Sequence, residues 1–381
     1  MHILVLIHEY PPVGGGGGRV AQDLAEGLVA RGHMVTVLTS AFGDLPREEI
    51  RGGVRIRRLP VARKEAFRAS FLSMGLFVLQ AVFHGWRFIR RERPDVIHAH
   101  FAVPAGAAAW ALALLTRVPY VLTAHLGDVP GGTPEKTGKW FRLVYPLTPP
   151  IWKRAAQAIA VSEFTRTLAR RHYDVPIQVI PNGVDVEALR PQEVAVHSPP
   201  RIVFAGRLVP QKNPLMVVNV LAQLRDLDWH CTMLGDGPLM PEVKEAIARH
   251  GLEARFTLPG WVTPEDVLAE FDRSDMLFMP SRSEGLPVVG VQALAKGLAL
   301  VVGKAGGFVD VVADNENGFS VSPEDIEKFT EVMASLLTDK TYLERLRKNS
   351  LSKAQRFSLF SIVLKYESVL GRAKDRLRGR T

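Results

Sequence analysis

The chain has 381 residues, of which 47% are hydrophobic and 23% are charged, with a formal net charge of +9. These values are typical of a soluble globular protein with two domains. The single cysteine, Cys231, excludes an internal disulfide and fits a reducing compartment, and the N-terminus lacks the positive region and cleavage site of a signal peptide, so we expect a cytoplasmic protein.

Apolar runs of strand length alternate with runs of helix length along the whole chain, and this pattern predicts parallel α/β sheets. In the first half the expected strands are Ile3–Ile7, Val35–Leu38, Val54–Leu59, Asp95–Ala99, Tyr120–Thr123, Ala158–Val161 and Gln178–Ile180. A second series comprises Arg201–Ala205, Cys231–Leu234, Arg255–Leu258, Met276–Met279, Leu298–Val302 and Gly318–Val321. The segment from Arg190 to Pro200 contains three prolines and little periodicity, so it is the best candidate for a linker between two domains.

Five glycines, Gly14 to Gly18, separate the first expected strand from a helix expected at Val20–Ala30. Glycine lets a ligand or another backbone approach closely and supplies positive φ. Arg19 stands where the dinucleotide fingerprint needs glycine, and no Walker ending follows, so neither a nicotinamide site nor a P-loop is expected. Two interpretations stay open, a mobile surface loop and a loop that faces a ligand cleft.

The net charge is concentrated in one segment. Between Arg51 and Arg93, eleven lysines and arginines less two acidic residues give +9, so the rest of the chain sums to zero. An apolar run in this segment, Phe71 to Ile89, is interrupted by polar residues, and we expect it to be too polar for a membrane span. It fits either an interfacial helix on anionic lipid or a half-buried helix with solvated basic flanks. Nucleic acid is not expected, because no zinc-finger or RRM signature is present.

Histidines stand at the ends of two expected strands in the first half. His125 follows Tyr120–Ala124, and with Gly127 and Asp128 beside it a sugar-facing role is favoured over a structural one. His98 and His100 flank the end of the preceding strand, where structural or acceptor-side packing is favoured over catalysis. The carboxyl ends of strands are where open α/β sheets bind ligands.

Two cations follow the first strand of the second series. Arg207 and Lys212 lie five residues apart on one loop, so both can reach a single diphosphate, the arginine as a fork and the lysine as a point charge. Solvated surface charges are the alternative. The residues that close the next two strands are suitably placed for a nucleoside: Gly235, Trp261 and Val262.

The segment Ser283 to Pro287 follows an apolar strand and opens a helix-like run. Glu284 supplies a carboxylate, and the backbone N–H groups at a helix start suit an anion such as a diphosphate. No metal site is expected, since no cluster of histidine, cysteine and aspartate suggests one. Asp226 and Asp228 have the D-x-D form but precede a strand, at the wrong end of a sheet, and we interpret them as a turn.

The order and spacing of these motifs resemble the retaining GT-B glycosyltransferases of family 4 over nearly the whole chain. The resemblance is carried by Pro11-Pro12 with the glycine-rich loop, His125-x-Gly127-Asp128, Val161-Ser162-Glu163, Pro181–Asp185, Gly206-Arg207 with Lys212, Gly235-Asp236-Gly237, and Ser283–Pro287. It implies two Rossmann-like, doubly wound α/β domains facing across a cleft, at residues 1–190 and 191–356. It also implies a C-terminal helix, residues 357–381, that crosses back to the first domain.

The resemblance also implies roles for single residues. Arg207 and Lys212 would neutralise the donor diphosphate, Glu284 would bind sugar hydroxyls, and His125 would lie near the transferred sugar. The implied donor-binding residues are Gly15, Gly16, Gly206, Gly235, Trp261, Val262, Gly285, Leu286 and Gln292, and the implied acceptor-side residues are His100 and Asp128. One position departs from the family pattern, because Gln292 stands where members commonly have glutamate for the ribose hydroxyls.

The expected activity is therefore metal-independent, retaining transfer of a hexosyl or related group from a nucleoside-diphosphate sugar to a glycan or lipid-linked acceptor. We expect this in cell-envelope polysaccharide or glycolipid synthesis, in the cytoplasm or peripherally at the inner membrane face, with no cofactor. Two alternatives stay open, a nucleotide-sugar 2-epimerase and a catalytically weak nucleotide-sugar-binding protein.

Overall fold

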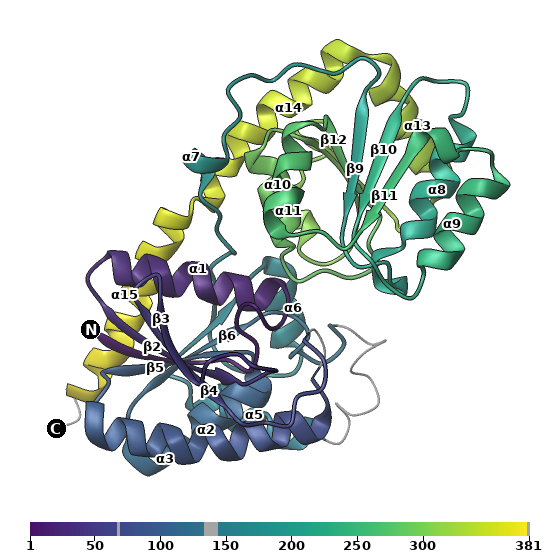
Figure 1. Cartoon of the computed structure of the whole chain (residues 1–381). Helices are drawn as coiled ribbons and strands as arrows, with labels where there is room; N and C mark the ends of the chain where they lie inside the picture. Colours follow the sequence, from purple (N-terminus) through teal and green to yellow (C-terminus); the bar gives the residue numbers. More distant parts are fainter. Residues whose placement is uncertain (67–68, 133–143, 379–381) are drawn as a thin grey trace. The chain divides into compact units, whose positions relative to one another are not determined.

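The computed structural model describes residues 1–66, 69–132 and 144–378 of the chain (Figure 1). The chain forms two compact units, the first from residues 1–183 and 359–381 and the second from residues 184–358. The polypeptide leaves the first unit after Gly183, ahead of the proline-containing segment, and returns to it after Ser358.

The first unit is built on an eight-stranded sheet in the order β3-β4-β2-β1-β5-β6-β7-β8. Its strands are β1 His2–Leu6, β2 Met34–Ser40, β3 Glu48–Arg51, β4 Val54–Leu59, β5 Val96–His100, β6 Tyr120–Ala124, β7 Gln157–Ala160 and β8 Ile177–Val179. The strand order reverses at β1, since β2 lies on one side of it and β5 on the other. The carboxyl ends of β1 and β5 therefore flank the position at which such sheets bind ligands.

Helices cover both faces of this sheet (Figure 1). They are α1 Gly16–Ala30, α2 Phe71–Glu92, α3 Ala107–Thr116, α5 Pro149–Arg154, α6 Glu163–Arg170 and α15 Leu359–Arg378, with short turns η1 Ala102–Gly106 and η2 Tyr145–Leu147. Alternation along β1 divides the core, because Ile3 and Val5 join the cluster under α1 and α15, while Leu4 and Leu6 join the cluster under α2, α3 and α5.

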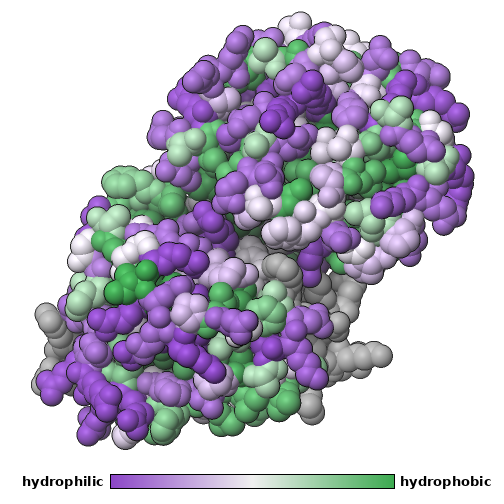
Figure 2. Space-filling model, in the orientation of Figure 1, coloured by the Kyte–Doolittle hydropathy of each residue, from purple (hydrophilic) through white to green (hydrophobic). Residues whose placement is uncertain are grey.

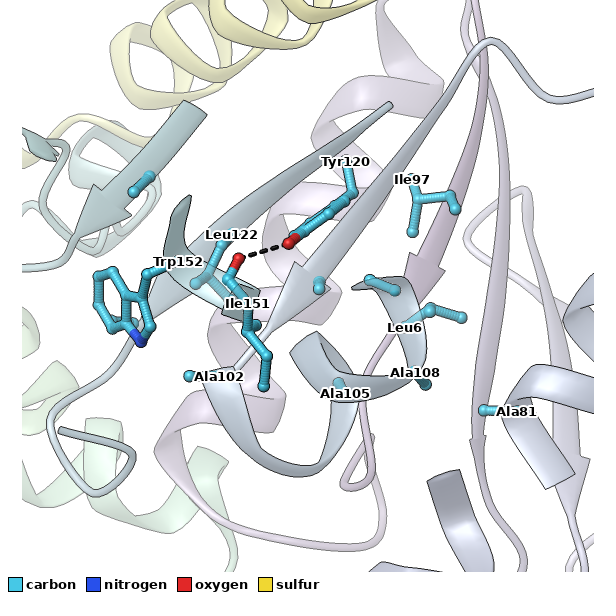
Figure 3. Close-up of a cluster of buried hydrophobic side chains, with 14 of the residues drawn as sticks. Leu6, Ala81, Ile97, Ala102, Ala105, Ala108, Tyr120, Leu122, Ile151 and Trp152 are labelled. Atoms are coloured by element: carbon cyan, nitrogen blue, oxygen red, sulfur yellow. Dashed lines mark hydrogen bonds between the residues drawn. The ribbon is translucent and has the colours of Figure 1, made fainter. Parts of the chain in front are cut away.

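Small side chains let the helices of the second cluster pack closely on the sheet (Figure 3). Ala81 of α2 and Ala108 of α3 are fully buried there. Tyr120 crosses the same cluster and donates a hydrogen bond from its hydroxyl to the carbonyl of Ile151. Trp152 stacks on Tyr173, with ring centroids 4.5 Å apart. The rings of Tyr120 and Trp152, which each carry one polar atom, thus contribute apolar area to the interior.

Helix α2 differs from the sequence-based expectation in one respect. Its mean hydropathy of 1.3 over an 18-residue window and its 22 residues satisfy the length and composition of a membrane span, contrary to the expectation that it is too polar. In the structure one face of α2 is buried in the core of the first unit through Ser73, Phe77, Ala81, Gly85 and Phe88. A core helix of a soluble protein passes the same composition test.

Two further elements of the first unit differ from expectation. The five glycines are not all loop, because α1 begins at Gly16 rather than at Val20 and Gly15 is its N-cap. Tertiary packing here overrides the low helix propensity of glycine. The structure also adds strand β3, which pairs with β4 in antiparallel register through the Gly52-Gly53 turn. Its sequence, Glu48–Arg51, is too polar to indicate a strand.

The second unit is built on a six-stranded parallel sheet in the order β11-β10-β9-β12-β13-β14. Its strands are β9 Arg201–Ala205, β10 His230–Leu234, β11 Phe256–Gly260, β12 Met276–Met279, β13 Ala299–Gly303 and β14 Gly318–Val321. Its helices are α7 Val186–Leu189, α8 Pro214–Gln223, α9 Met240–Arg249, α10 Pro264–Asp272, α11 Val288–Ala295, α12 Phe308–Val311, α13 Ile326–Thr338 and α14 Lys340–Ala354. Short 3-10 turns occur at η3 Pro210–Lys212, η4 Glu253–Arg255 and η5 Gln355–Phe357.

The expected doubly wound α/β architecture is confirmed in both units. The second strand order reverses at β9, which pairs with β10 on one side and with β12 on the other. Strands β12 and β13 are buried along their entire lengths, as strands covered on both faces must be.

Candidate functional site

The reversal point of the second sheet brings together two loops that lie far apart in the sequence. Residues 206–213 follow β9 and residues 280–287 follow β12, and these two strands are hydrogen-bonded neighbours. Backbone and side-chain bonds join the loops, because the amide of Arg282 donates to the carbonyl of Gln211 at 2.8 Å and Gln211 Nε2 donates to the carbonyl of Ser283 at 2.8 Å. The candidate donor residues therefore share one rigid platform.

Lys212 and Glu284 form an ion pair across this point. The ammonium of Lys212 donates to Oε1 of Glu284, and only 16% and 8% of the two side chains are exposed. Charged groups with so little access to water need a partner of opposite charge, and here each side chain is the partner of the other. The pair joins two of the predicted catalytic residues, which are 72 positions apart in the chain.

Arg207 occupies the same platform with a different environment. It is exposed, and in the described part of the chain its side chain makes no ion pair. The side chain of Lys212 passes over Gly206, the residue before Arg207, because a Cβ atom built on Gly206 would lie 3.7 Å from Lys212 Cε. One guanidinium is therefore free to bind an anion beside an ammonium that already has a partner.

Close backbone packing explains one of the predicted glycines, Gly235, without any ligand. Gly235 has φ of +128°, and a Cβ built there would lie 2.1 Å from the carbonyl oxygen of Gly206. The loop after β10 is also joined to the loop after β9 by a 3.0 Å bond from the amide of Leu208 to the carbonyl of Asp236. Gly235 therefore shapes the platform, whereas a Cβ on Gly206 would meet no atom closer than 3.6 Å.

The remaining predicted donor residues lie at nearby strand ends or on α11. Leu286 is buried and Gly285 is half-buried, just before α11, and Gln292 is half-buried within that helix. Trp261, which follows β11, is 64% exposed, and its neighbour Val262 is half-buried. An indole this exposed presents a flat apolar face to solvent.

The sequence analysis missed a glycine pair that supports Glu284. Gly306 and Gly307 follow β13, and the amide of Gly307 donates to the carbonyl of Glu284 at 2.9 Å. A Cβ on Gly306 would lie 1.7 Å from that same carbonyl oxygen, and φ at Gly306 is +60°. The signal was present, as a Gly-Gly pair four residues after the end of an expected strand.

In the first unit the glycine-rich segment lies in the connection between β1 and α1. The amide of Gly14 donates to the carbonyl of Ala66 at 2.9 Å, which anchors the start of the loop. A Cβ on Gly17 would lie 2.5 Å from the Phe101 ring, whereas one on Gly15 would meet no atom within 4 Å. Gly15 is thus open, while Gly17 is required by packing.

Asp128 fixes the loops that follow β5 and β6. Its Oδ1 accepts a hydrogen bond from the amide of His125 at 2.9 Å, and its Oδ2 accepts one from the amide of Ala102 at 2.6 Å. The side chain is buried, and burial raises the pKa of Asp128 although these backbone donors oppose the rise. The structure therefore gives Asp128 a positioning role in the loop that carries His125.

His125 is half-buried and belongs to a cluster of uncharged histidines with half-buried His8 and fully buried His98 and His100. His100 Nδ1 and His125 Nε2 are 3.0 Å apart, and the rings of His98 and His100 lie 4.2 Å apart. Burial lowers the pKa of His8, His98 and His125 to about 3, and it lowers the pKa of His100 well below 6.5. In a neutral pair one ring must donate and the other accept, so the contact couples the tautomers of His100 and His125.

The C-terminal helix also reaches this cluster. Tyr366 of α15 is buried, and its ring centroid lies 5.4 Å from that of His98. Thr123 at the end of β6 donates to the Tyr366 hydroxyl at 3.5 Å and bonds His98 Nε2 at 2.9 Å. The far end of the chain therefore helps to order the histidine cluster.

Backbone strain marks the same place. Phe101 has φ of +71° and Leu126 has φ of +103°, conformations that bulky side chains rarely adopt. They directly follow His100 and His125, and the Phe101 ring lies 4.5 Å from that of His125. Such strain persists where the surroundings enforce it and is concentrated at functional sites. The sequence analysis missed both residues, and it also missed His8, whose ring lies 5.2 Å from Phe101.

Asp226 lies in the turn between α8 and β10, and Asp228 follows it before that strand begins, as expected. Among the described residues no group of three or more histidine, cysteine, aspartate or glutamate side chains is arranged to hold a metal ion.

Comparison with known proteins gives two adjoining family matches. The model of Glycosyltransferase Family 4 matches residues 14–188, and that of Glycosyl transferases group 1 matches residues 185–353. Their junction lies beside the end of the first unit's N-terminal segment at Gly183.

Individual proteins are similar along almost the whole chain. The 2-deoxystreptamine glucosyltransferase of Streptomyces kanamyceticus is 28% identical over 92% of this chain and 98% of its own length. The sucrose-phosphate synthase of Thermosynechococcus elongatus has a TM-score of 0.85 at 19% identity, covering 100% of both chains. Anabaena HepE, solved in complex with UDP and glucose, has a TM-score of 0.76 at 21% identity, covering 97% of this chain and 99% of its own. These structural likenesses show the GT-B fold.

Proposed function

The chain belongs to the GT-B glycosyltransferases of family 4, and from this membership we propose that it transfers a hexosyl or related group from a nucleoside-diphosphate sugar to a hydroxyl of a glycan or lipid-linked acceptor, with retention of configuration and without a metal ion. The observation that carries the proposal is the platform at the reversal point of the second sheet, where Arg207 is free beside the Lys212–Glu284 pair.

The platform suits the chemistry of the leaving group. When the bond from the anomeric carbon to the phosphate oxygen breaks, negative charge grows on the departing diphosphate. Arg207 offers a guanidinium fork, and Lys212 can move from Glu284 to the phosphate oxygens, leaving the carboxylate to accept bonds from sugar hydroxyls. Preorganised charges of this kind stabilise the transition state more than the ground state.

For retention, we propose that the acceptor hydroxyl attacks the face from which the diphosphate departs. A bond forms between the acceptor oxygen and the anomeric carbon while the bond between that carbon and the phosphate oxygen breaks. The proton of the acceptor hydroxyl passes to the departing phosphate. No enzyme nucleophile is needed. The uncharged imidazole of His125 can hydrogen-bond a sugar hydroxyl in this scheme, since its pKa, lowered by burial to about 3, keeps it neutral.

We further propose that Gly15 and the N-terminus of α1 contribute to donor binding. A Cβ built on Gly15 would meet no atom within 4 Å, so the space beside this residue is open. Gly15 is also the N-cap of α1, and the first amides of a helix are available to an anion. The ligands in the Anabaena HepE structure, UDP and glucose, support a nucleotide-sugar donor for this chain. We propose a role in cell-envelope polysaccharide or glycolipid synthesis.

The proposal is tested by incubating the purified protein with UDP-, GDP- and ADP-sugars and a panel of glycan and lipid acceptors. We expect transfer from one donor class, with the anomeric configuration retained by NMR. Arg207→Ala should lower turnover by about tenfold or more, because losing 1.4 kcal/mol of transition-state stabilisation is a factor of ten. Arg225→Ala, at an exposed position of the same unit, is the matched control and should leave turnover unchanged.

Near-normal turnover in Arg207→Ala would contradict the site assignment. An epimer formed without any acceptor would favour the 2-epimerase alternative, which the comparisons do not support. Failure to transfer from any donor, with nucleotide binding intact, would favour the weakly catalytic binding protein.

A further inference from the structure

A pocket lined with arginines lies in the first unit, away from the strand ends described above. It has a volume of about 410 Å³ between α2 and strands β2 to β4. Its lining includes five arginines, Arg47, Arg57, Arg58, Arg87 and Arg91, against two glutamates, Glu48 and Glu92. The lining thus carries an excess of positive charge.

The arginines of this pocket are incompletely paired. Arg57 Nε lies 3.3 Å from Glu48, whose side chain is itself 65% exposed. Arg58 is almost fully buried and bonds Glu49 and the carbonyl of Pro46, yet its Nε has no hydrogen-bond partner among the described residues. Arg87 and Arg91 are exposed and form no ion pair in the part of the chain that the structure describes. Guanidinium groups in this state favour a phosphate ligand.

The same helix presents a separate apolar stripe to solvent. Leu72, Leu79, Phe83 and Trp86 recur at spacings of seven, four and three, so they share one face of α2, and they are 68%, 68%, 54% and 41% exposed. Leu114 and Leu115 of α3, the helix packed on α2, are also exposed. Figure 2 shows hydrophobic and hydrophilic side chains close together along the edge of the first unit where α2 and α3 lie in Figure 1.

The geometry points to a membrane-docking surface, made of the stripe Leu72, Leu79, Phe83 and Trp86 with the arginine pocket beside it, whose occupant is a bilayer containing anionic phospholipid. The two parts match the two layers of such a surface. The stripe suits the acyl boundary and the arginines suit headgroup phosphates. Two guanidinium groups lie directly over rings of the stripe, Arg87 over Phe83 at 5.6 Å and Arg90 over Trp86 at 5.9 Å, so positive charge and apolar area adjoin on this helix.

Neither the arginine pocket nor the apolar stripe alone would indicate an anionic lipid bilayer. A nucleic acid would use the arginines but not the leucines and aromatic rings of the stripe, and a second protein copy would not require anionic lipid. The combination of charge and exposed apolar area on adjoining faces of one helix favours lipid. This docking does not depend on the transfer reaction.

The test is flotation of the purified full chain with vesicles of phosphatidylcholine alone or with 30% phosphatidylglycerol, as the chosen probe composition. We expect binding to the anionic vesicles that weakens with salt. Arg87→Gln with Arg91→Gln should reduce that binding by about tenfold or more, because each basic residue near an anionic surface contributes roughly 1 kcal/mol. The control pair Arg225→Gln with Arg249→Gln removes the same charge from exposed positions of the second unit and should retain binding.

A second variant separates lipid from other anions. Leu79→Ser with Phe83→Ser keeps every charge and alters exposed positions, so it should fold normally and lose most vesicle binding. Unchanged binding by this variant, or equal binding of the wild-type chain to neutral and anionic vesicles, would overturn the proposal. Nucleoside-diphosphate binding should be unchanged in both variants, which separates this result from a failure of the proposed transferase activity.

Discussion

The two reversal points of the molecule have the same topology and opposite chemistry. In the second unit, loops after neighbouring strands bring an arginine, a lysine and a glutamate together, two of them paired. In the first unit, loops after β1, β5 and β6 bring together four histidines that burial keeps uncharged. The same α/β fold therefore carries a charged platform in the second unit and a neutral hydrogen-bonding cluster in the first unit.

The difference follows from what each site would bind. A diphosphate carries charge that grows as it leaves, so preorganised cations and backbone donors stabilise it. A sugar hydroxyl carries no charge, and neutral imidazoles bind it without attracting competing anions. We propose that the second unit binds the leaving group and that the first unit recognises hydroxyls, and the following changes are designed to test that division of roles.

The largest effect is expected from removing Lys212. Lys212→Met should lower turnover by about a hundredfold, because it removes one preorganised cation from the leaving group. It should also destabilise the second unit by roughly 1–3 kcal/mol, since Glu284 would stay buried without its partner. Steady-state kinetics and urea denaturation measure the two effects.

The double variant Lys212→Met with Glu284→Gln separates those two consequences. It should recover most of the stability, since no unpaired charge remains, but none of the turnover. Recovery of turnover would mean that the pair is only structural. Lys244→Met, at an exposed position of α9, should change neither quantity.

A smaller effect is expected from pH on the first unit. The folded-state pKa values of its four clustered histidines lie far below 6.5, so between pH 6.5 and about 3 the unfolded chain binds more protons and stability should fall as the pH falls. Two aspartates have the opposite effect on stability, because burial raises the pKa of Asp23 to about 6 and also raises the pKa of Asp128. Four histidines outnumber these two groups, so the net stability should still fall as the pH falls.

Calorimetric unfolding between pH 7.5 and 4.5 measures this slope, with proteolysis of the heated chain identifying the unit that opens. We expect first-unit fragments to appear at lower temperature as the pH falls. A first unit whose unfolding temperature is constant over this range would show that its histidines are not buried in the neutral form.

The smallest effect is expected at Gln292. Gln292→Glu replaces a neutral acceptor by a charged one, and charge-assisted hydrogen bonds are about twice as strong as neutral ones. KM for the donor should fall by about twofold to fivefold with little change in turnover. An unchanged or higher KM would indicate that this half-buried position of α11 does not contact the ribose.

Much of the fold was predictable because its parallel strands carry a recognisable apolar pattern, continuous in Met276–Met279 and interrupted by arginines in Val54–Leu59. Val54–Leu59, Arg201–Ala205, Met276–Met279 and Gly318–Val321 were predicted with the bounds that the structure gives. Strand β3 was not, because a polar edge strand has no apolar pattern to detect. The start of α1 was also missed, since packing of Gly17 and Gly18 against Phe101 and Glu9 overrides glycine's propensity.

The candidate site was predictable only as separate loops. Strand ends identify where Arg207, Glu284 and His125 stand, but strand order decides which loops meet. The Lys212–Glu284 pair spans 72 residues and exists because β9 neighbours β12. The strained backbone at Phe101 and Leu126 depends on tertiary packing, and no local sequence signal indicates it.

The most direct measurement of the central claim is nucleotide binding compared between the two sites. Thermal-shift screening of UDP, GDP and ADP identifies the base, since a bound ligand stabilises in proportion to ln(1 + [L]/Kd). Titration calorimetry with that nucleotide then compares Arg207→Ala with His125→Asn. We predict that Kd rises by about tenfold or more in Arg207→Ala and stays within about twofold of wild type in His125→Asn. Equal Kd values in Arg207→Ala and the wild-type chain would contradict the account.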